Sequence, residues 1–137
     1  MKTIIFGGTT EGREQAALAL ARGDDVRVSV TSEYARQFLP KGAACHVGAL
    51  DEAAMTAWLM QERPERIIDA THPFAVRATQ TIRACADALH IPYTRIERAG
   101  DRREDWRDAV TWADDSEEAA ALAARCKGNI LLTTGSH

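Results

Sequence analysis

The stretch Lys2-Thr3-Ile4-Ile5-Phe6-Gly7-Gly8-Thr9-Thr10-Glu11-Gly12-Arg13 joins a short apolar run to a glycine-rich turn. The run, residues 2–6, is short and contains β-branched side chains, which predicts a buried strand. Alanine or leucine at many positions of residues 12–22 then predicts a buried helix. A strand, a glycine turn and a helix in this order are typical of the first unit of a parallel α/β sheet.

The rest of the chain continues this alternation of strands and helices. We predict strands at residues 26–30, 43–47, 66–70, 91–96, 110–113 and 129–133, and helices at 34–39, after Asp51, from Pro73 to Leu89, and at 115–126. The fold class expected is α/β, with a doubly wound, Rossmann-like parallel sheet that has helices on both faces. Right-handed crossovers bring the carboxyl ends of the strands to one edge, where such sheets bind ligands.

Composition excludes several classes of protein. The chain has 137 residues, 45% hydrophobic and 27% charged, a balance that fits one globular domain and argues against disorder. No run approaches the ~20 apolar residues of a membrane span. The net charge of −3 lacks the basic excess typical of nucleic-acid binding. The three cysteines form no CxxC pair, so we expect no metal site, no disulfide framework and a cytoplasmic protein.

The turn after the first strand is a variant of the GxGxxG loop that binds dinucleotides. Gly7 and Gly12 match its outer glycines, whereas Thr9 stands at the central position. A tight turn at a helix N-terminus presents backbone N–H groups to a pyrophosphate, and hydroxyls or an arginine add further donors. The predicted cofactor-binding residues of this turn are Gly7, Gly8, Thr9, Thr10, Glu11, Gly12 and Arg13.

The residues after the second strand bear on the choice of cofactor. Thr31 and Ser32 are neutral, and with Arg36 nearby they favour the 2′-phosphate of NADP. Glu33 keeps NAD open, because a shift of one or two residues would place this carboxylate on the ribose. Ser32 and Glu33 are equally compatible with capping the next helix.

The end of the fourth strand carries the most informative polar residues. Thr71 and His72 lie at the predicted ligand edge, and His72 is a candidate to donate a proton or to orient a substrate. Asp69 falls within a buried strand, so it needs a backbone or hydroxyl partner. Phe74 could pack beside a flat ring, but its position on the helical stripe favours the core.

The third and fifth strands contribute further candidates. Gly48 is expected near the adenine, whereas Asp51 is better explained as a helix cap. Arg95 and Arg98 could hold substrate carboxylates by bidentate contact. The alternative for Arg95 is a surface ion pair with Glu97, which contributes little.

Five segments together resemble the precorrin-6A reductases of cobalamin biosynthesis, a family that includes the cobalt-precorrin-6A reductases. They are Gly-Gly-Thr-Thr-Glu-Gly-Arg at 7–13, Val-Thr-Ser-Glu-Tyr at 30–34, Asp-Ala-Thr-His-Pro-Phe-Ala at 69–75, Ile-Pro-Tyr-Thr-Arg-Ile-Glu-Arg at 91–98 and Leu-Leu-Thr-Thr-Gly-Ser at 131–136. The resemblance implies hydride transfer from NADPH, or alternatively NADH, to a ring double bond of precorrin-6A, giving precorrin-6B. Anaerobic relatives act on the cobalt-containing tetrapyrrole.

The resemblance also implies roles for particular residues. Thr31, Ser32 and Tyr34 would line the adenosine side, Thr71 and His72 would be the catalytic residues beside the nicotinamide and macrocycle, and Arg95 and Arg98 would bind substrate. Family members carry a second lobe. We therefore expect residues 1–128 to form the Rossmann-like cofactor-binding domain and residues 129–137 to begin a second lobe, otherwise missing, with no nucleic-acid or membrane partner.

Two other classes of function remain open. One is another Rossmann-fold oxidoreductase or epimerase, although Tyr34 is not followed by the lysine of a Tyr-x-x-x-Lys pair. The other is a non-enzymatic nucleotide-sensing module on the same fold. The Thr71-His72 pair and the two arginines after the fifth strand argue against a sensing module. A phospho-receiver domain is disfavoured, because no acidic pair follows the first strand.

Overall fold

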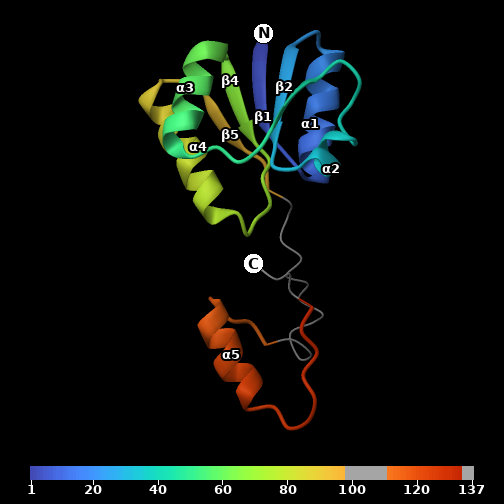
Figure 1. Ribbon diagram of the computed structural model, residues 1–137, viewed down its shortest axis with the longest axis vertical. Coiled ribbons are helices and arrows are strands. Elements are labelled where there is room, and N and C mark those ends of the chain that lie inside the picture. The colour runs from blue at the N-terminus through green and yellow to red at the C-terminus, as the bar shows by residue number, and fades with distance from the viewer. Residues whose placement is uncertain (98–110, 134–137) are drawn as a thin grey trace. The chain divides into compact units, whose positions relative to one another are not determined.

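A computed structural model of the chain describes residues 1–97 and 111–133. The chain divides into two compact units, Met1–Gly100 and Asp101–His137, each considered by itself (Figure 1). The first unit contains the sheet and four of the helices. Its elements are β1 (Lys2–Phe6), α1 (Thr10–Ala21), β2 (Asp25–Val30), α2 (Glu33–Arg36), β3 (Ala44–Val47), α3 (Glu52–Glu62), β4 (Arg66–Asp69), α4 (Val76–Ala88) and β5 (Tyr93–Arg95).

The five strands form one parallel sheet in the order β3-β2-β1-β4-β5. The strand β1 is central, and Phe6 at its end is in register with Ser29 of β2 and Asp69 of β4. The chain fills the sheet first toward β3 and then, from β4 on, toward β5. The order therefore reverses between β1 and β4, and the carboxyl edge at that point is where ligands bind in such sheets.

Helices cover both faces of the sheet, as the sequence predicts (Figure 1). On one face, α1 and α2 pack on β1, β2 and β3 over a buried cluster that includes Ile5, Ala16 and Val28. On the other face, α3 and α4 pack over a cluster that includes Ile4 and Leu59. The prediction of a doubly wound, Rossmann-like α/β fold is confirmed.

The helix predicted from Pro73 begins three residues later, at Val76. The backbone N–H of Phe74 donates to Nδ1 of His72, and that of Ala75 donates to the His72 carbonyl. Residues 72–75 thus form a turn, and the first bond of the helical ladder runs from the Thr79 amide to the Ala75 carbonyl at 3.1 Å, so the helix starts after the turn. Phe74 is 89% exposed, and the prediction that it packs in the core is wrong.

The helix predicted at residues 34–39 is shorter than expected, because α2 ends at Arg36. The amides of Phe38 and Leu39 bond three residues back, which tightens the chain into turns. Pro40 lacks the N–H that would continue a helix from Arg36.

In the second unit, the predicted helix is confirmed as α5 (Ser116–Ala124), and Asp115 caps it by accepting from the Glu118 amide at 2.7 Å. The strand predicted at 129–133 is wrong, and so is the described part, 111–113, of the strand predicted at 110–113, since these residues are not in a strand. An apolar run forms a strand only where a neighbour pairs its backbone groups, and in the described parts of the chain these residues join no sheet. Leu131 and Leu132 are 86% and 79% exposed. Val110, the first residue of the strand predicted at 110–113, lies outside the described residues.

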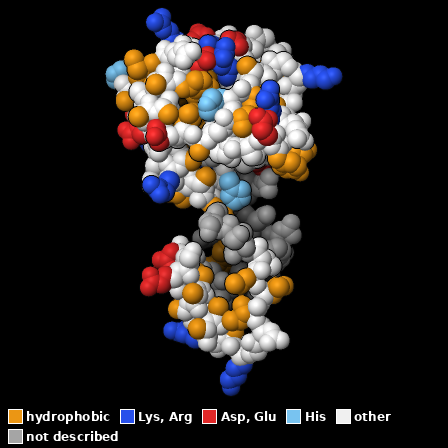
Figure 2. All heavy atoms as spheres, in the orientation of Figure 1, with side chains coloured by type: hydrophobic (Ala, Val, Ile, Leu, Met, Phe, Trp, Pro, Cys, Tyr) orange, Lys and Arg blue, Asp and Glu red, His pale blue; other side chains and the backbone are white. Residues whose placement is uncertain are grey.

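On the face that Figure 2 shows, basic and acidic side chains are interspersed, in keeping with the small net charge. Within residues 1–97 and 111–133, no helix is long and apolar enough to cross a membrane.

Candidate functional site

The turn between β1 and α1 is built around Thr9, which is the N-cap of α1. Its Oγ1 accepts a hydrogen bond from the Gly12 amide at 3.1 Å and donates one to the carbonyl of Ala70 at 2.6 Å. The first bond satisfies one of the unpaired N–H groups of the helix start. The second ties the beginning of α1 to the end of β4, on the two sides of the point where the strand order reverses. The hydroxyl predicted to contact phosphate thus performs two structural tasks.

The structure gives a steric reason for glycine at two positions of the turn. Gly8 has a φ of +101°, and a Cβ added there would meet nothing within 4 Å, so the space in front of the turn is open. A Cβ on Gly12 would lie 3.0 Å from the Cα of Gly7. The glycine at position 12 therefore lets the first turn of α1 lie close against the end of β1. An open turn at a helix N-terminus is what a pyrophosphate requires.

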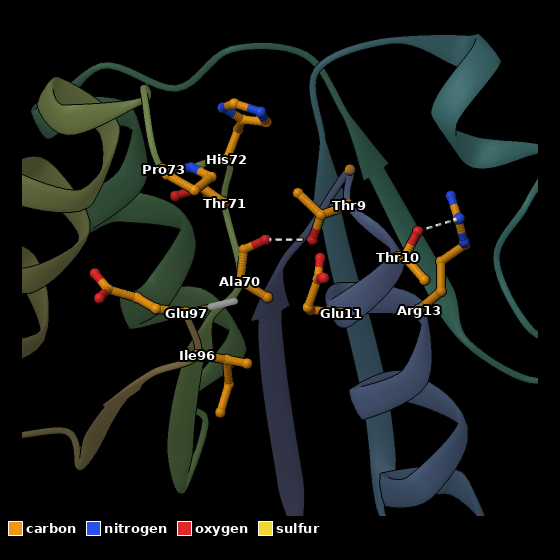
Figure 3. Close-up of a pocket in the computed structure, with 11 residues that line it drawn as sticks. Thr9, Thr10, Glu11, Arg13, Ala70, Thr71, His72, Pro73, Ile96 and Glu97 are labelled. Atoms are coloured by element: carbon orange, nitrogen blue, oxygen red, sulfur yellow. Dashed lines mark hydrogen bonds between the residues drawn. The ribbon is translucent and has the colours of Figure 1, made fainter. Parts of the chain in front are cut away.

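A pocket of about 290 Å³ lies between the start of α1 and the ends of β4 and β5 (Figure 3). Glu11 and Glu97 are the two carboxylates in its wall, and Arg13 is its guanidinium. Thr9 and Glu11 lie on the side of the turn toward Ala70, whereas Thr10 and Arg13 lie on the opposite side. The residues that line it are Gly8, Thr9, Thr10, Glu11, Arg13, Ala70, Thr71, His72, Pro73, Ile96 and Glu97.

The guanidinium of Arg13 is held in place by two contacts. Its Nη2 donates to Oγ1 of Thr10 at 2.9 Å, and its Cζ lies 5.6 Å from the centroid of the Phe38 ring. Phe38 also packs edge-on against Tyr34, with the ring centroids 5.0 Å apart. Arg13 thus lies beside the segment that contains α2, where NADP-binding folds place the 2′-phosphate.

A second pocket of about 120 Å³ lies between the ends of β1, β2 and β3 and the helices α3 and α4, which contribute Met55, Ala78 and Ile82 to its lining. It contains Thr31 and Gly48, both predicted for the adenosine side, together with Gly7 from the turn. Thr71 lines this pocket and the larger one as well. The two groups of predicted cofactor residues therefore line two pockets that share Thr71 in their walls.

The other residues predicted for the adenosine side lie on α2 and at its start. Ser32 is the N-cap of α2 and accepts from the Ala35 amide at 3.2 Å, which confirms its capping role. Tyr34 is 70% exposed. Arg36 forms an exposed ion pair with Glu33, with 3.5 Å between Nη1 and Oε1. Asp51 likewise caps α3 through the Ala54 amide at 2.8 Å, as predicted.

The end of β4 carries a buried carboxylate, Asp69, with no exposed surface. Its Oδ1 accepts from the Thr71 amide at 3.0 Å, from the Thr71 hydroxyl at 2.8 Å and from Nη1 of Arg95 at 2.8 Å. Its Oδ2 accepts from the Tyr93 hydroxyl at 2.9 Å. The expectation that Asp69 has backbone and hydroxyl partners is confirmed.

These contacts set the protonation of the group. Burial by itself raises the pKa of Asp69, but the hydrogen bonds from Thr71 and Tyr93 and the charge of Arg95 together bring it below the ordinary value. Burial, followed by the hydrogen bond to Asp69, raises the pKa of Tyr93 to about 12. The carboxylate is therefore ionised and the phenol is its hydrogen-bond donor at neutral pH.

Arg95 and Arg98 were both predicted to bind substrate. The Nη1 of Arg95 is directed at Asp69, and its Nε lies 3.4 Å from Oε1 of Glu97. Only 17% of its side chain is exposed. Arg98 lies outside the described residues.

His72 is exposed in the turn after β4 and contacts Phe74 in two ways. Its Nδ1 accepts the Phe74 amide hydrogen at 3.2 Å, and the two rings pack edge to face with their centroids 5.0 Å apart. A neutral imidazole that accepts at Nδ1 carries its hydrogen on Nε2. His72 therefore offers an N–H donor at the rim of the pocket.

Sequence reasoning found the turn and the residues after β4, but it assigned no role in the site to Tyr93, Ala70 or Ile96. Tyr93 and Arg95 are two positions apart on one strand, so both reach the same neighbour, Asp69. The spacing of Tyr93 and Arg95, together with a buried acid on another strand, is the sequence signal that points to this part of the site. Ala70 contributes a backbone carbonyl, for which a side-chain pattern carries no information.

The sheet and its edge define a class: a Rossmann-like α/β domain with a glycine turn and a pocket at the strand-order reversal. The family described as Precorrin-6x reductase CbiJ/CobK matches this chain over residues 2–137. The chain belongs to that family.

Curated relatives agree with this assignment. The chain is 34% identical to the cobalt-precorrin-6A reductase of Priestia megaterium, over 97% of this chain and 52% of that protein. It is 31% identical to the precorrin-6A reductase of Mycobacterium tuberculosis (strain ATCC 25618 / H37Rv), over 98% of this chain and 53% of that protein. The chain thus spans about half the length of the curated relatives it matches.

A solved structure supports the fold. The structure titled CobK precorrin-6A reductase superposes with a TM-score of 0.66 and 22% identity, over 76% of this chain and 41% of that one. At this identity the likeness concerns the fold alone.

Proposed function

We propose that this chain binds NADPH, with NADH as the alternative, and supplies the cofactor half of a reductase. The reaction is reduction of a ring double bond of precorrin-6A or cobalt-precorrin-6A to precorrin-6B or its cobalt form. The observation that carries this proposal is the bond from Thr9 to Ala70, which frames an open pocket in front of Gly8 at the strand-order reversal. The names of the relatives supply the substrate class.

In this proposal the dinucleotide crosses the carboxyl edge from the smaller pocket to the larger one. The adenosine lies toward Thr31 and Gly48, and the pyrophosphate lies on the turn in front of Gly8. The nicotinamide lies toward His72. The backbone N–H groups and the dipole of α1 supply the attraction for the phosphates, since Glu11 and Glu97 add negative charge to the same pocket.

The preference for NADPH rests on the guanidinium groups beside α2. Arg13 is held over the Phe38 ring, and Arg36 is on α2 itself. An arginine near the end of the second strand accommodates a 2′-phosphate. The pair that Arg36 makes with Glu33 is exposed and weak, so a phosphate can displace it.

The cofactor supplies the hydride, and the chain orients the reacting groups. Nε2 of His72 donates a hydrogen bond at the mouth of the pocket, and Thr71 fixes the wall between the two pockets. Arg98 stays the candidate for binding substrate carboxylates, together with the guanidinium nitrogens of Arg95 that do not bond Asp69. The proposal keeps residues 1–128 as the cofactor domain and residues 129–137 as the start of a second lobe.

The test is a charge placed at the start of α1. Gly12→Asp is unsuitable, because any side chain at position 12 would meet the backbone of Gly7. Thr10 is exposed and is the first residue of α1, where a carboxylate is compatible with the helix dipole. We expect Thr10→Asp to weaken NADP⁺ binding at least about tenfold in titration calorimetry, an effect of ~1.4 kcal/mol.

The matched control is Thr10→Asn, which has the same shape without the charge. It should stay within about threefold of the unmodified chain. Equal affinities for Thr10→Asp and Thr10→Asn would place the pyrophosphate elsewhere. If the unmodified chain binds neither NADP⁺ nor NAD⁺, the proposed function fails altogether.

A further inference from the structure

The carboxylate of Asp69 is the best-connected buried charge at the carboxyl edge. It has no exposed surface, and Thr71, Tyr93 and Arg95 supply its hydrogen-bond donors. Tyr93 and Arg95 come from β5, the neighbouring strand, which is in register with β4. A buried carboxylate with this many donors is costly to build and costly to disturb.

The hydrogen bonds of Thr71 explain what the carboxylate does. The Thr71 hydroxyl donates its hydrogen to Oδ1 of Asp69 and lies 2.9 Å from Nη1 of Arg95, which donates to it. Its remaining contact is Oγ1 of Thr79 on α4, at 3.2 Å. With the amide also bound to Asp69, both the backbone and the side chain of Thr71 are fixed. The hydrogen bonds of the hydroxyl are taken up by these partners, so its role is to hold Thr71 in place.

Thr71 is the residue whose position affects both pockets, because it lines the larger and the smaller one. The next residue is His72, and the carbonyl of Ala70 on the other side receives the bond from Thr9. A shift of Thr71 would therefore change the shape of both pockets together.

From this geometry we infer that Asp69 is a positioning residue, which acts through Thr71 to hold the wall shared by the two pockets, with Tyr93 and Arg95 as its supports. The inference rests on the proposed function for its ligand. The inference also gives Arg95 a role other than the predicted binding of substrate: its Nη1 forms an ion pair with Asp69 and donates to the Thr71 hydroxyl.

The experiment compares Asp69→Asn with Thr71→Val, singly and together. Asp69→Asn keeps the shape and removes the charge, so the bonds to Thr71 weaken and Arg95 loses its buried partner. We expect NADP⁺ to bind about tenfold more weakly to Asp69→Asn, as for the loss of a hydrogen bond to a charged group. If Asp69 acts through Thr71, the double variant binds no more weakly than the weaker single variant.

The control for stability alone is Val26→Ala. Val26 is buried near the start of β2, at the edge of the sheet opposite the two pockets, and lines neither of them, so its truncation lowers stability without altering the wall. NADP⁺ affinity should then stay within about twofold of the unmodified chain. An equal loss of affinity in Val26→Ala, or additive losses in the double variant, would overturn the inference.

A second measurement does not depend on the ligand. Amide hydrogen exchange of the ligand-free chain should be at least about tenfold faster at Thr71 in Asp69→Asn than in the unmodified chain, and unchanged on β2. Unchanged exchange at Thr71 overturns the positioning role even where NADP⁺ binds. If exchange at Thr71 is faster in Asp69→Asn but the unmodified chain binds no dinucleotide, the proposed function is wrong and the positioning role of Asp69 is supported.

Should Asp69→Asn not fold, Tyr93→Phe replaces it. That change removes only the donor to Oδ2 and keeps the bonds from Oδ1 to Thr71. The expected loss of NADP⁺ affinity is about threefold, again without further loss when it is combined with Thr71→Val. Additivity in this pair counts against the inference in the same way.

Discussion

The hydroxyl of Thr9 donates a hydrogen bond to the carbonyl of Ala70 across 2.6 Å, and so joins the start of α1 to the end of β4. The two residues are far apart in the chain and lie on opposite sides of the strand-order reversal. The same hydroxyl accepts from the Gly12 amide as the cap of α1. A dinucleotide turn usually has a glycine at this position, and here a side chain uses that space to brace the pocket.

Removing the Thr9 hydroxyl should lower stability through two losses, that of the cap of α1 and that of the hydrogen bond to Ala70. We expect Thr9→Val to lower the free energy of unfolding by about 2–3 kcal/mol, the sum of a lost cap and a lost bond to a part-buried carbonyl. Urea denaturation measures this loss. Thr9→Ser is the matched control, since it keeps the oxygen, and should lose less than about 1 kcal/mol. A loss for Thr9→Ser as large as that for Thr9→Val would show that the hydroxyl is not responsible.

Alanine substitutions at the two outer glycines of the turn should differ in whether a second substitution can relieve the steric clash. A Cβ on Gly7 would lie 3.0 Å from Cγ1 of Val28, a side-chain atom, whereas a Cβ on Gly12 would meet the backbone of Gly7. We expect each alanine variant to lose about 1–3 kcal/mol of unfolding free energy, as for overpacking. Val28→Ala should reduce the cost of Gly7→Ala in the double variant and leave the cost of Gly12→Ala unchanged. Denaturation of the two double variants decides this, and equal relief in both would contradict the geometry.

The sequence predicts the sheet and the turn well because both depend on local pattern. Short β-branched runs and glycines mark β1, β2 and β4, and these strands lie within one residue of their predicted ends. The errors fall where a tertiary partner decides. The segment 129–133 has the apolar pattern of a strand without a place in the sheet, and residues 72–75 close a turn between the His72 carbonyl and the Ala75 amide, after which α4 begins.

The site is predicted less completely than the fold. The residues of the turn and the Thr71-His72 pair are recognisable because they follow strands directly. The part played by Asp69 depends on Tyr93 and Arg95, which are 24 and 26 positions away in the sequence. Only the pairing of β4 with β5 brings these side chains together, and single-sequence patterns do not specify which strands pair.

The stability that Asp69 contributes should depend on pH in a defined window. Its pKa in the folded chain is below the ordinary 3.8, so the unfolded chain takes up the proton first as the pH falls. The contribution is therefore fully present above about pH 4 and is lost as the pH falls through the folded value. We expect the difference in unfolding free energy between the unmodified chain and Asp69→Asn to shrink below pH 3.8. Urea denaturation at a series of pH values tests this, and a constant difference down to pH 2 would contradict it.

The phenol of Tyr93 should report on the same network at high pH. Burial and the bond to Asp69 raise its pKa to about 12, so the stability it contributes is present below its ordinary pKa of 10.0 and is lost as the pH rises through 12. Ultraviolet absorbance should show an ionisation step near pH 12 that is absent in Tyr93→Phe. In Asp69→Asn the step should move to lower pH, because the acceptor and its charge are gone. A step that stays near pH 12 in this variant would mean that Asp69 does not raise it.

His72 should act through its two nitrogens in separable ways. Nδ1 accepts from the Phe74 amide and holds the turn, which leaves Nε2–H to donate into the pocket. The side-chain oxygen of asparagine can replace Nδ1, whereas the amide of glutamine reaches the place of Nε2. We therefore expect His72→Asn to leave the exchange rate of the Phe74 amide unchanged and to weaken NADPH binding about tenfold, as for one lost hydrogen bond. His72→Gln should do the reverse, with faster exchange at Phe74 and binding within about threefold of the unmodified chain. If both variants bind NADPH as the unmodified chain does, Nε2 makes no contact with the dinucleotide, and the histidine serves only to shape the turn before α4.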